Sequence, residues 1–475
     1  MQTLQSTSIE PKIEELEQHF DPIGAMSGLL DVNYPVLLDS ALVRPGLGQY
    51  SYVTADPFLV VRSKGRQVEV IEHGDVTEQE DNPFSVLQRL LAEFATNRRE
   101  DGPPFQGGAI GYFGYEMGGL LERLPGTAVD DLALPDMSIG FYDWVVAFDH
   151  ASGRSWLVTT EFSRKGRAEW VRERIAKARV ASTYTNGLST IAANLRSNFT
   201  HEQYVEAVNR VKSYIVAGDI YQANISQRFQ GTVNADAWTL YQSLRNTAPA
   251  PFGAYLGFPD SCVLSASPEQ FLRAEDGFVE TRPMKGTRPR GTSHDDDIRL
   301  GRELAASEKD RAENIMIVDL LRNDLGRVCV PGSIRVPELF AVEKYPNVHQ
   351  LVSSVTGRLR REYDAIDLLT ACFPGGSVTG APKIRAMEII DEIEPVQRGV
   401  YCGAIGYIGF NGSMQLSIPI RTMLKKGHRV YLQVGGGIVA DSDPDAEYQE
   451  TLDKARGGLE ALGISGLQTQ RLGVS

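Results

Sequence analysis

Hydrophobic and polar positions divide this 475-residue chain into a strand-rich first part and a second part in which strands and helices alternate. Residues 34–38 and 155–160 are rich in β-branched and aromatic side chains, a composition that predicts strands. Residues 84–95 and 164–180 carry apolar side chains at helical spacing, which predicts two helices. The chain therefore mixes both kinds of element from its first part onward.

A stretch without pattern separates the two parts. Residues 182–198 are polar and show no clear period, so we predict a domain boundary there. The first part then covers residues 20–165, and the second part covers residues 199–462.

The second part opens with a helix that we predict over residues 201–217. Thr200 or Asn198 is expected to cap its N-terminus, and Glu202 places a negative charge in its first turn. Gly218 is expected to end the helix, because glycine is the common residue just past a helix C-terminus.

One short sequence occurs in each part, as GAIGYFG at residues 108–114 and as GAIGYIG at residues 403–409. Glycine and aromatic residues at this spacing suit strands that pack closely against a neighbour. Either the chain contains a duplicated α/β unit or two glycine-rich strands resemble each other by coincidence, and the sequence leaves both open.

The composition and net charge of the chain argue against several classes of function. An apolar content of 42% is enough for a large core. The net charge of -13 argues against nucleic-acid binding through a basic surface. Four cysteines form no CxxC pair and no zinc-type cluster, so we interpret them as reduced structural thiols. No apolar run has membrane-spanning length and no signal segment is present, so we expect a cytoplasmic protein without a membrane partner.

The first segment with possible chemistry is TRPMKGTRPRG, which contains Lys285 and follows SASPEQF with Glu269. Pro283 and Gly286 flank the lysine, which indicates a side chain held in place. A lysine nucleophile must be neutral, so burial or nearby positive charge has to lower its pKa. A basic surface loop is the structural alternative, and composition alone favours it.

The second segment, residues 309–324, is predicted to form a buried helix on which Asp310 and Glu313 share one face. A carboxylate beside an otherwise apolar helix is either paired or a metal ligand. A salt bridge to Arg311 or Arg322 is the structural alternative.

The third segment, residues 434–458, combines glycines with a second acidic helix. A strand that ends at Val434 leads into three glycines, whose N–H groups could bind a carboxylate. Asp443 before Pro444 predicts a helix start. One stripe of this helix then carries Glu447, Glu450 and Lys454. Two acids and a cation beside a glycine nest suit a magnesium ion and an anionic substrate, whereas surface pairing of the second acid with the lysine is the alternative.

Two glycine-rich segments do not match known nucleotide-binding motifs. Residues 373–395 hold a glycine-rich turn before a predicted helix, but the phosphate-loop pattern GxxxxGK[ST] is absent. The glycines at residues 107–119 lack the acidic residue expected of a dinucleotide site.

Taken together, these segments resemble the family of chorismate-utilising enzymes. The resemblance covers LLDSA near residue 37, the glycine region at 105–119, LPDM at 134–137 and nearly all of residues 219–457, in the same order and spacing. It implies an α/β fold in which two antiparallel sheets form a sandwich flanked by helices. It also implies two interleaved similar halves.

Within the family, the motif PMKGT at residues 283–287 indicates the reaction. Subunits of aminodeoxychorismate synthase look like PIKGT here, whereas anthranilate synthases have alanine at the lysine position. The resemblance therefore implies conversion of chorismate and ammonia to 4-amino-4-deoxychorismate, for para-aminobenzoate and folate biosynthesis. A separate glutamine amidotransferase subunit would supply the ammonia. An anthranilate synthase large subunit and a non-catalytic tryptophan-binding partner of a glutaminase are the alternatives.

The resemblance also implies residue roles. Lys285 matches a covalent nucleophile that attacks C2 of the ring, and Glu269 matches the general acid that protonates the departing 4-hydroxyl. Glu313 and Glu450 match ligands of Mg²⁺, supported by Asp310 and Glu447. The matching substrate-binding positions are Gln222, Ser377, Tyr401, Arg421, Gly436, Gly437 and Lys454.

A tryptophan pocket is common in the first part of these enzymes, and here we expect it to be structural or vestigial. The positions that match its walls are Ser40, Leu47, Gly48, Gln49, Tyr50, Pro251, Phe252 and Gly253. One position departs from the family pattern, because Gln350 stands where many relatives have histidine before Leu-Val-Ser.

Overall fold

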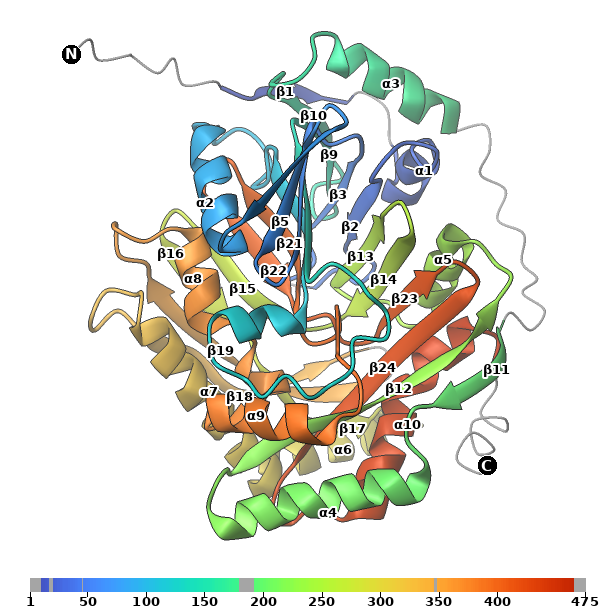
Figure 1. The fold of residues 1–475 in the computed structure, drawn as a ribbon, viewed down its shortest axis with the longest axis vertical. Coiled ribbons are helices and arrows are strands. Elements are labelled where there is room, and N and C mark those ends of the chain that lie inside the picture. The colour runs from blue at the N-terminus through green and yellow to red at the C-terminus, as the bar shows by residue number, and fades with distance from the viewer. Residues whose placement is uncertain (1–9, 17–19, 45, 179–191, 346–347, 465–475) are drawn as a thin grey trace.

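The computed structural model describes residues 10–16, 20–44, 46–178, 192–345 and 348–464, which form two packed sheets with helices outside (Figure 1). Each sheet has twelve strands within these ranges, and the named strands pair antiparallel. The prediction of two antiparallel sheets with flanking helices is therefore confirmed.

The strand order of the first sheet alternates between distant parts of the chain. In spatial order its strands are β1 (Lys12–Glu15), β10 (Ser155–Thr159), β9 (Trp144–Asp149), β3 (Tyr50–Thr54), β2 (Val36–Asp39), β13 (Phe252–Gly257), β14 (Ser261–Ser267), β23 (Thr422–Lys426), β24 (Arg429–Ile438), β12 (Gln222–Val233) and β11 (Ala192–Ser197). The short strand β20 (Gly380–Ala381) also pairs with β12.

The second sheet is built in the same way. In spatial order its strands are β17 (Met284–Pro289), β19 (Val348–Arg358), β16 (Phe278–Thr281), β15 (Gln270–Glu275), β22 (Met414–Ser417), β21 (Ala404–Gly409), β7 (Gly108–Phe113), β8 (Met137–Tyr142), β4 (Leu59–Lys64), β5 (Gln67–Glu72) and β6 (Asp75–Glu80). Strand β18 (Arg335–Lys344) pairs with β19.

Helices cover the outer faces of both sheets (Figure 1). They are α1 (Pro22–Ser27), α2 (Pro83–Glu93), α3 (Arg167–Ala178), α4 (His201–Ala217), α5 (Ala237–Thr247), α6 (His294–Ala306), α7 (Glu308–Gly326), α8 (Ala365–Cys372), α9 (Lys383–Ile393) and α10 (Pro444–Ala461), with 3₁₀ turns η1 (Tyr115–Leu120) and η2 (Gly376–Val378). No helix in the described ranges is long and apolar enough to cross a lipid bilayer.

The core between the sheets is aromatic. Tyr407 of β21 lies with its ring centroid 5.5 Å from that of Tyr52 of β3, and 4.5 Å from that of Phe105. Ring pairs at these distances stabilise the fold beyond the contribution of the apolar area that they bury. Strands from both parts of the chain therefore meet in one buried layer, which joins the sheets.

Local signals in the sequence agree with the helix ends. Thr200 caps α4 in a reciprocal capping box with Gln203, and Gly218 follows the helix with φ +84°. Asp443 caps α10 through the backbone N–H of Ala446, directly before Pro444. These contacts satisfy donors that a helix start leaves free.

The two copies of the repeated sequence are hydrogen-bonded to each other. Strand β7 pairs antiparallel with β21, and Gly111 lies opposite Gly406. A Cβ atom at Gly406 would lie 2.0 Å from the carbonyl oxygen of Gln415, so only glycine fits there. Counted outward from this central pair, β8, β4 and β5 on one side occupy the same positions in the sheet as β22, β15 and β16 on the other side. The strand arrangement is that of two interleaved halves.

The predicted boundary at residues 182–198 lies mostly outside the described residues. Its described end contains β11, which pairs with the outer edge of β12. Because residues 20–165 and 199–462 both contribute strands to each sheet, the two predicted parts share one sandwich.

Candidate active site

Lys285 lies on β17, where this strand bends against α7. The pairing of β17 with β19 shifts register between Lys285 and Thr287, and Gly286 between them has φ +79°. A Cβ atom at Gly286 would lie 2.9 Å from the Asp310 side chain of α7. Glycine therefore allows the close approach of the helix that fixes the direction of the lysine.

The Lys285 amine points at the glycines of β24. A Cβ atom at Gly437 would lie 3.2 Å from the Lys285 Nζ and 1.9 Å from the Gln222 Nε2. Strands β12, β17 and β24 thus bring Gln222, Lys285 and Gly437 together. Three of the predicted site residues are brought together there.

Burial lowers the pKa of Lys285 from its ordinary value, and the positive charge of Lys454 acts in the same direction. Glu313, Glu269 and Glu450 oppose this shift through their negative charges. A lowered pKa increases the fraction of neutral amine, which is the nucleophilic form. The other four side chains are therefore close enough to Lys285 to act on it electrostatically, as the predicted site requires.

Glu269 is buried between β14 and β15, with 3% of its surface exposed. Burial raises its pKa to about 7, although a hydrogen bond from Ser377 and the charge of Lys285 lower it. The Ser377 Oγ donates to the Glu269 Oε1 over 2.6 Å. A carboxyl group with such a pKa can hold a proton near neutral pH and release it to a leaving group.

The two acidic residues of α7 that were predicted for the site each have a cationic neighbour. Asp310 accepts from Arg288 at 2.9 Å, and Glu313 lies 4.0 Å from Lys309. Burial raises the pKa of Glu313, and the negative charge of Asp310 adds to this rise. The salt-bridge alternative is therefore right in kind for Asp310, although Arg288 is the partner instead of Arg311 or Arg322.

The acidic stripe of α10 faces the glycine strand. A Cβ atom at Gly436 would lie 3.1 Å from the Glu447 Oε2 and 3.9 Å from the Glu450 Oε1. The Lys454 Nζ donates to the carbonyl oxygen of Gly435 at 2.9 Å and lies 2.7 Å from Glu450. The Glu450–Lys454 surface pair is thus present, and it lies within the site. The charge of Lys454 lowers the pKa of Glu450, whereas burial raises the pKa of Glu447.

No group of three or more histidine, cysteine or acidic side chains is gathered for a metal ion among the described residues. Glu313 and Glu450 nonetheless lie close enough to interact, because the charge of Glu450 raises the pKa of Glu313. Magnesium commonly uses one or two protein carboxylates and completes its shell with water and substrate oxygens. Glu313 and Glu450, two partly exposed carboxylates near Lys285, fit that pattern.

The glycine strand is longer than predicted. Strand β24 continues through the three glycines to Ile438 and does not end at Val434, because the glycines pair with β12. The predicted end of the strand at Val434 is therefore wrong. Each glycine presents its backbone groups to one side only, as in any antiparallel ladder.

This alternation decides which N–H groups are available. Asn224 donates its N–H away from β24, to the turn after η2, so the next residue, Ile225, faces β24. Its partner there is Gly436, whose N–H is consequently used in the ladder. The N–H groups of Gly435 and Gly437 point to the other edge of β24, which β23 covers only as far as Leu432. The pattern thus favours Gly435 in place of Gly436 as an anion contact.

Arg421 lies near Glu269, and Tyr401 lies near Arg398. Arg421 has a left-handed backbone with φ +52° directly before β23, and its guanidinium is close enough to lower the pKa of Glu269. Tyr401 is buried and packs in the core of the second sheet, with its ring 5.9 Å from the Arg398 guanidinium. Sequence reasoning missed Arg398, whose signal is only a charged residue in an otherwise apolar and glycine-rich stretch.

Gln350 lies beside the lysine strand, opposite Thr287, and donates to the Thr287 hydroxyl at 3.3 Å. His349 points away from it and lies 2.8 Å from Asp297, a carboxylate that also binds Arg290. The histidine next to Gln350 is therefore buried in a contact with Asp297 and does not replace the missing family histidine.

The predicted tryptophan pocket is a small cavity of about 40 Å³ between the sheets. Of the predicted wall residues, those that line it are Ser40, Tyr50, Pro251, Phe252 and Gly253. Leu47, Gly48 and Gln49 do not line it, and Gln49 donates to Asp149 instead. The volume holds about three water molecules, which is less than an indole ring needs.

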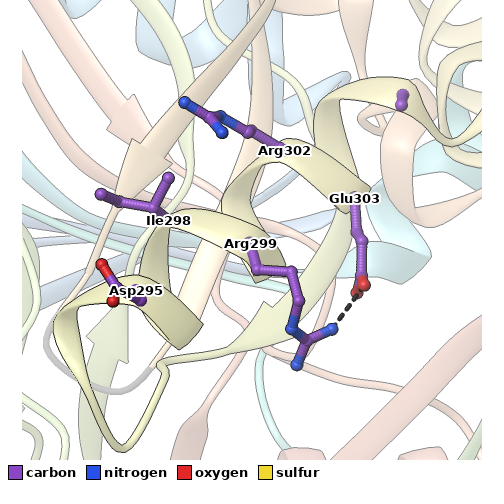
Figure 2. Close-up of a pocket in the computed structure, with 6 residues that line it drawn as sticks. Asp295, Ile298, Arg299, Arg302 and Glu303 are labelled. Atoms are coloured by element: carbon purple, nitrogen blue, oxygen red, sulfur yellow. Dashed lines mark hydrogen bonds and ion pairs between the residues drawn. The ribbon is translucent and has the colours of Figure 1, made fainter.

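A shallow hollow of about 650 Å³ lies away from these residues, on α6. Figure 2 shows that its lining side chains come from this one helix, with Arg299 paired to Glu303. A hollow without a second wall cannot enclose a small molecule. It is not a candidate for the active site.

The sequence profile of the chorismate binding enzymes matches residues 50–460 of the chain. The chain belongs to this family. Every catalytic, metal and substrate residue named above lies inside the matched range, as does the predicted pocket except for Ser40 and Leu47 to Gln49.

Two kinds of named relative are similar in sequence to this chorismate-binding enzyme. It is 43% identical to the aminodeoxychorismate synthase component 1 of Salmonella typhimurium, over 97% of this chain and 99% of the relative. It is 38% identical to the anthranilate synthase component 1 of Aquifex aeolicus, over 91% of this chain and 90% of the relative. The crystal structure of anthranilate synthase component I from Streptococcus pneumoniae is similar, with a TM-score of 0.77 and 32% identity over 88% of this chain and 93% of the other.

Proposed function

We propose that this enzyme aminates chorismate at C4 to give 4-amino-4-deoxychorismate. The observation that carries the proposal is the position of the Lys285 amine, which points at Gly437 and Gln222 beside three carboxylates. Such an amine is placed to attack a ring bound against the glycine strand. The 43% identical relative named aminodeoxychorismate synthase component 1 supports the same assignment.

In the first step the neutral Lys285 amine forms a bond to C2 of the ring. Both ring double bonds shift, from C1=C2 to C1=C6 and from C5=C6 to C4=C5, the C4–oxygen bond breaks, and the proton of Glu269 leaves with the hydroxyl group as water. The pKa of about 7 suits this transfer, because roughly half of the acid is still protonated at neutral pH. The lysine nitrogen then loses its extra proton to the carboxylate.

In the second step ammonia forms a bond to C4, both double bonds shift back, the bond from C2 to the lysine nitrogen breaks, and one proton of the ammonia is transferred to that nitrogen. The amine of Lys285 is regenerated. Chorismate and ammonia thus give the amino product and water, and two allylic displacements replace one difficult substitution.

Mg²⁺ fits this proposal as a cofactor. Glu313 and Glu450 would hold it, because both carboxylates are close enough to Lys285 to affect its pKa and Glu450 is close enough to Glu313 to raise its pKa. When bound, the ion would neutralise the ring carboxylate of chorismate. Lys454 and the N–H groups of Gly435 and Gly437 would bind and orient the remaining anionic groups.

Gln222 would keep water from reacting. Its amide group cannot accept a proton at neutral pH, so it cannot act as the base that would activate water for attack. The side chain is 1% exposed, and its Oε1 has no hydrogen-bond partner among the described residues. It is therefore available as an acceptor for a substrate hydroxyl or for ammonia.

A glutamine amidotransferase subunit is proposed as the source of ammonia, since the relatives are named as a first component. We also propose a cytoplasmic location. The four cysteines are free, and three of them are buried, which suits a reducing compartment.

Product analysis tests the function. Purified protein with chorismate, Mg²⁺ and ammonium is expected to form aminodeoxychorismate, and Lys285→Ala is expected to lower that rate on the order of 10³-fold or more. Lys425→Ala, at a partly exposed lysine on β23, is the matched control and should keep the wild-type rate. Anthranilate as the wild-type product would instead support the second candidate function, that of the 38% identical relative.

A further inference from the structure

A second charged group is buried beside the proposed active site. The Arg398 guanidinium has only 2% of its side chain exposed and donates four hydrogen bonds within the structure. Two go to Glu394, from Nε at 2.9 Å and from Nη2 at 2.7 Å. The other two go to backbone carbonyl oxygens, those of Val378 at 3.0 Å and Asn224 at 2.7 Å.

The two carbonyl groups belong to segments that carry site residues. Val378 directly follows Ser377, the donor to Glu269, and Asn224 lies two residues after Gln222. The chain that continues from Arg398 itself leads to Tyr401, whose N–H donates to the Arg398 carbonyl oxygen at 3.3 Å. One planar side chain therefore connects three separate segments of the site.

The surroundings hold this side chain in one position. Glu394, at the end of α9, also accepts from the N–H and hydroxyl of Ser226, both at 2.8 Å. The guanidinium lies 4.5 Å from the centre of the Tyr115 ring. The backbone N–H of Arg398 donates to Glu116 at 2.8 Å. Only the rigid fork of an arginine can serve carbonyl groups on two segments and a carboxylate at once.

We propose that Arg398 is a positioning residue for chorismate binding, which fixes Gln222, Ser377 and Tyr401 relative to one another. It does not touch the reacting atoms in this arrangement and acts only through these three segments. The role rests on the proposed function, because it assumes that these segments contact chorismate.

A purely structural ion pair would behave differently. Breaking it would lower the fraction of folded protein, and every folded molecule would then bind chorismate as the wild type does. A positioning role changes the site within the folded protein. Chorismate then binds more weakly, and Glu269 loses part of the Ser377 hydrogen bond that lowers its pKa.

Arg398→Lys is the main test, because it keeps the positive charge beside Glu394 and removes the fork. Glu394→Gln is the second variant, since it keeps an acceptor for Arg398 and Ser226 but removes the negative charge. Arg385→Lys on α9, whose guanidinium pairs with Glu388 on the exposed side of the helix, is the matched control.

Thermal unfolding establishes that each variant is folded, and calorimetry then measures the dissociation constant of chorismate without ammonium. We expect Arg398→Lys to weaken binding about tenfold or more, and Glu394→Gln to act in the same direction. The high-pH limb of the amination rate should move to higher pH in both, because the acid keeps its proton longer. The Arg385→Lys control should match the wild type in all three measurements.

Folded variants with a wild-type dissociation constant and an unmoved pH limb would overturn the positioning role. A failure of the proposed function looks different. If the wild type makes anthranilate, the dissociation constants of the variants still decide the role of Arg398. If the wild type does not bind chorismate at all, both proposals fail together.

Discussion

Ser377 on η2 and Glu269 after β14 are joined by a 2.6 Å hydrogen bond, although they lie 108 residues apart. The hydroxyl is a donor to the carboxylate, so the bond stabilises the ionised form of the acid. The turn at η2 thereby adjusts the protonation of the group that we propose as general acid.

Ser377→Ala is expected to raise the pKa of Glu269 above about 7, because the lost hydrogen bond favours the charged form. The reaction needs the protonated acid, so the rate falls as the pH rises through this pKa, and the variant should keep its rate to a higher pH. The pH dependence of aminodeoxychorismate formation measures the shift. Ser413→Ala, in a turn beside Pro104, is the control. A pH limb that does not move would contradict the assignment of Glu269 as the acid.

Glu269→Gln is expected to change how stability depends on pH. The folded protein keeps the proton of this carboxyl up to a pKa of about 7, whereas the unfolded chain loses it near the ordinary value of 4.5. The stability of the wild type therefore falls as the pH rises between these values, by up to about 3 kcal/mol. The variant has no such loss, so it should gain on the wild type over that range. Urea unfolding at several pH values tests this, and two parallel stability curves would speak against it.

Gly437→Ala is expected to lower activity strongly while the protein stays folded. The new methyl group would lie 1.9 Å from the Gln222 Nε2 and 3.2 Å from the Lys285 Nζ, so both side chains must move. A misplaced nucleophile commonly costs on the order of 10²-fold in rate. Gly119→Ala is the matched control, because a Cβ atom there has no atom within 4 Å. Equal rates for the two variants would show that the lysine does not need this position.

Removal of divalent metal with a chelator is expected to abolish amination, and added Mg²⁺ should restore it. Glu313→Gln and Glu450→Gln should each raise the Mg²⁺ concentration needed for half-maximal rate, by about tenfold or more. Glu460→Gln, an exposed acid near the end of α10, is the control. Titration of the rate with Mg²⁺ gives the comparison. Unchanged requirements in both test variants would remove these carboxylates from the metal site.

Local chemistry explains which elements could be predicted from the sequence. The helix over residues 201–217 was predictable to the residue, because its periodicity, its Thr200 cap and Gly218 all act within a few residues. The glycines of β24 led to a strand predicted too short, because glycine usually weakens a strand. The pairing with β12 that keeps them in the strand is a long-range contact, which the local sequence does not show.

The candidate site follows the same division. Residue types with a reactive group, such as Lys285 and Glu269, could be found in the sequence by their surroundings and their resemblance to a family. Gly435 and Arg398 could not, because their roles depend on the side to which a backbone N–H points and on carbonyl groups of other segments. Such partners are set by tertiary structure and leave no local pattern.

The place of β24 inside the first sheet has a consequence for synthesis of the chain. This strand is made last, yet it is inserted between β23 and β12, and α10 packs on it afterwards. A growing polypeptide on the ribosome therefore leaves the inner edges of β23 and β12 exposed until translation is nearly finished. A product cut short before this strand would lack both the continuous sheet and the glycines that face Lys285, so no partial chain can begin to consume chorismate.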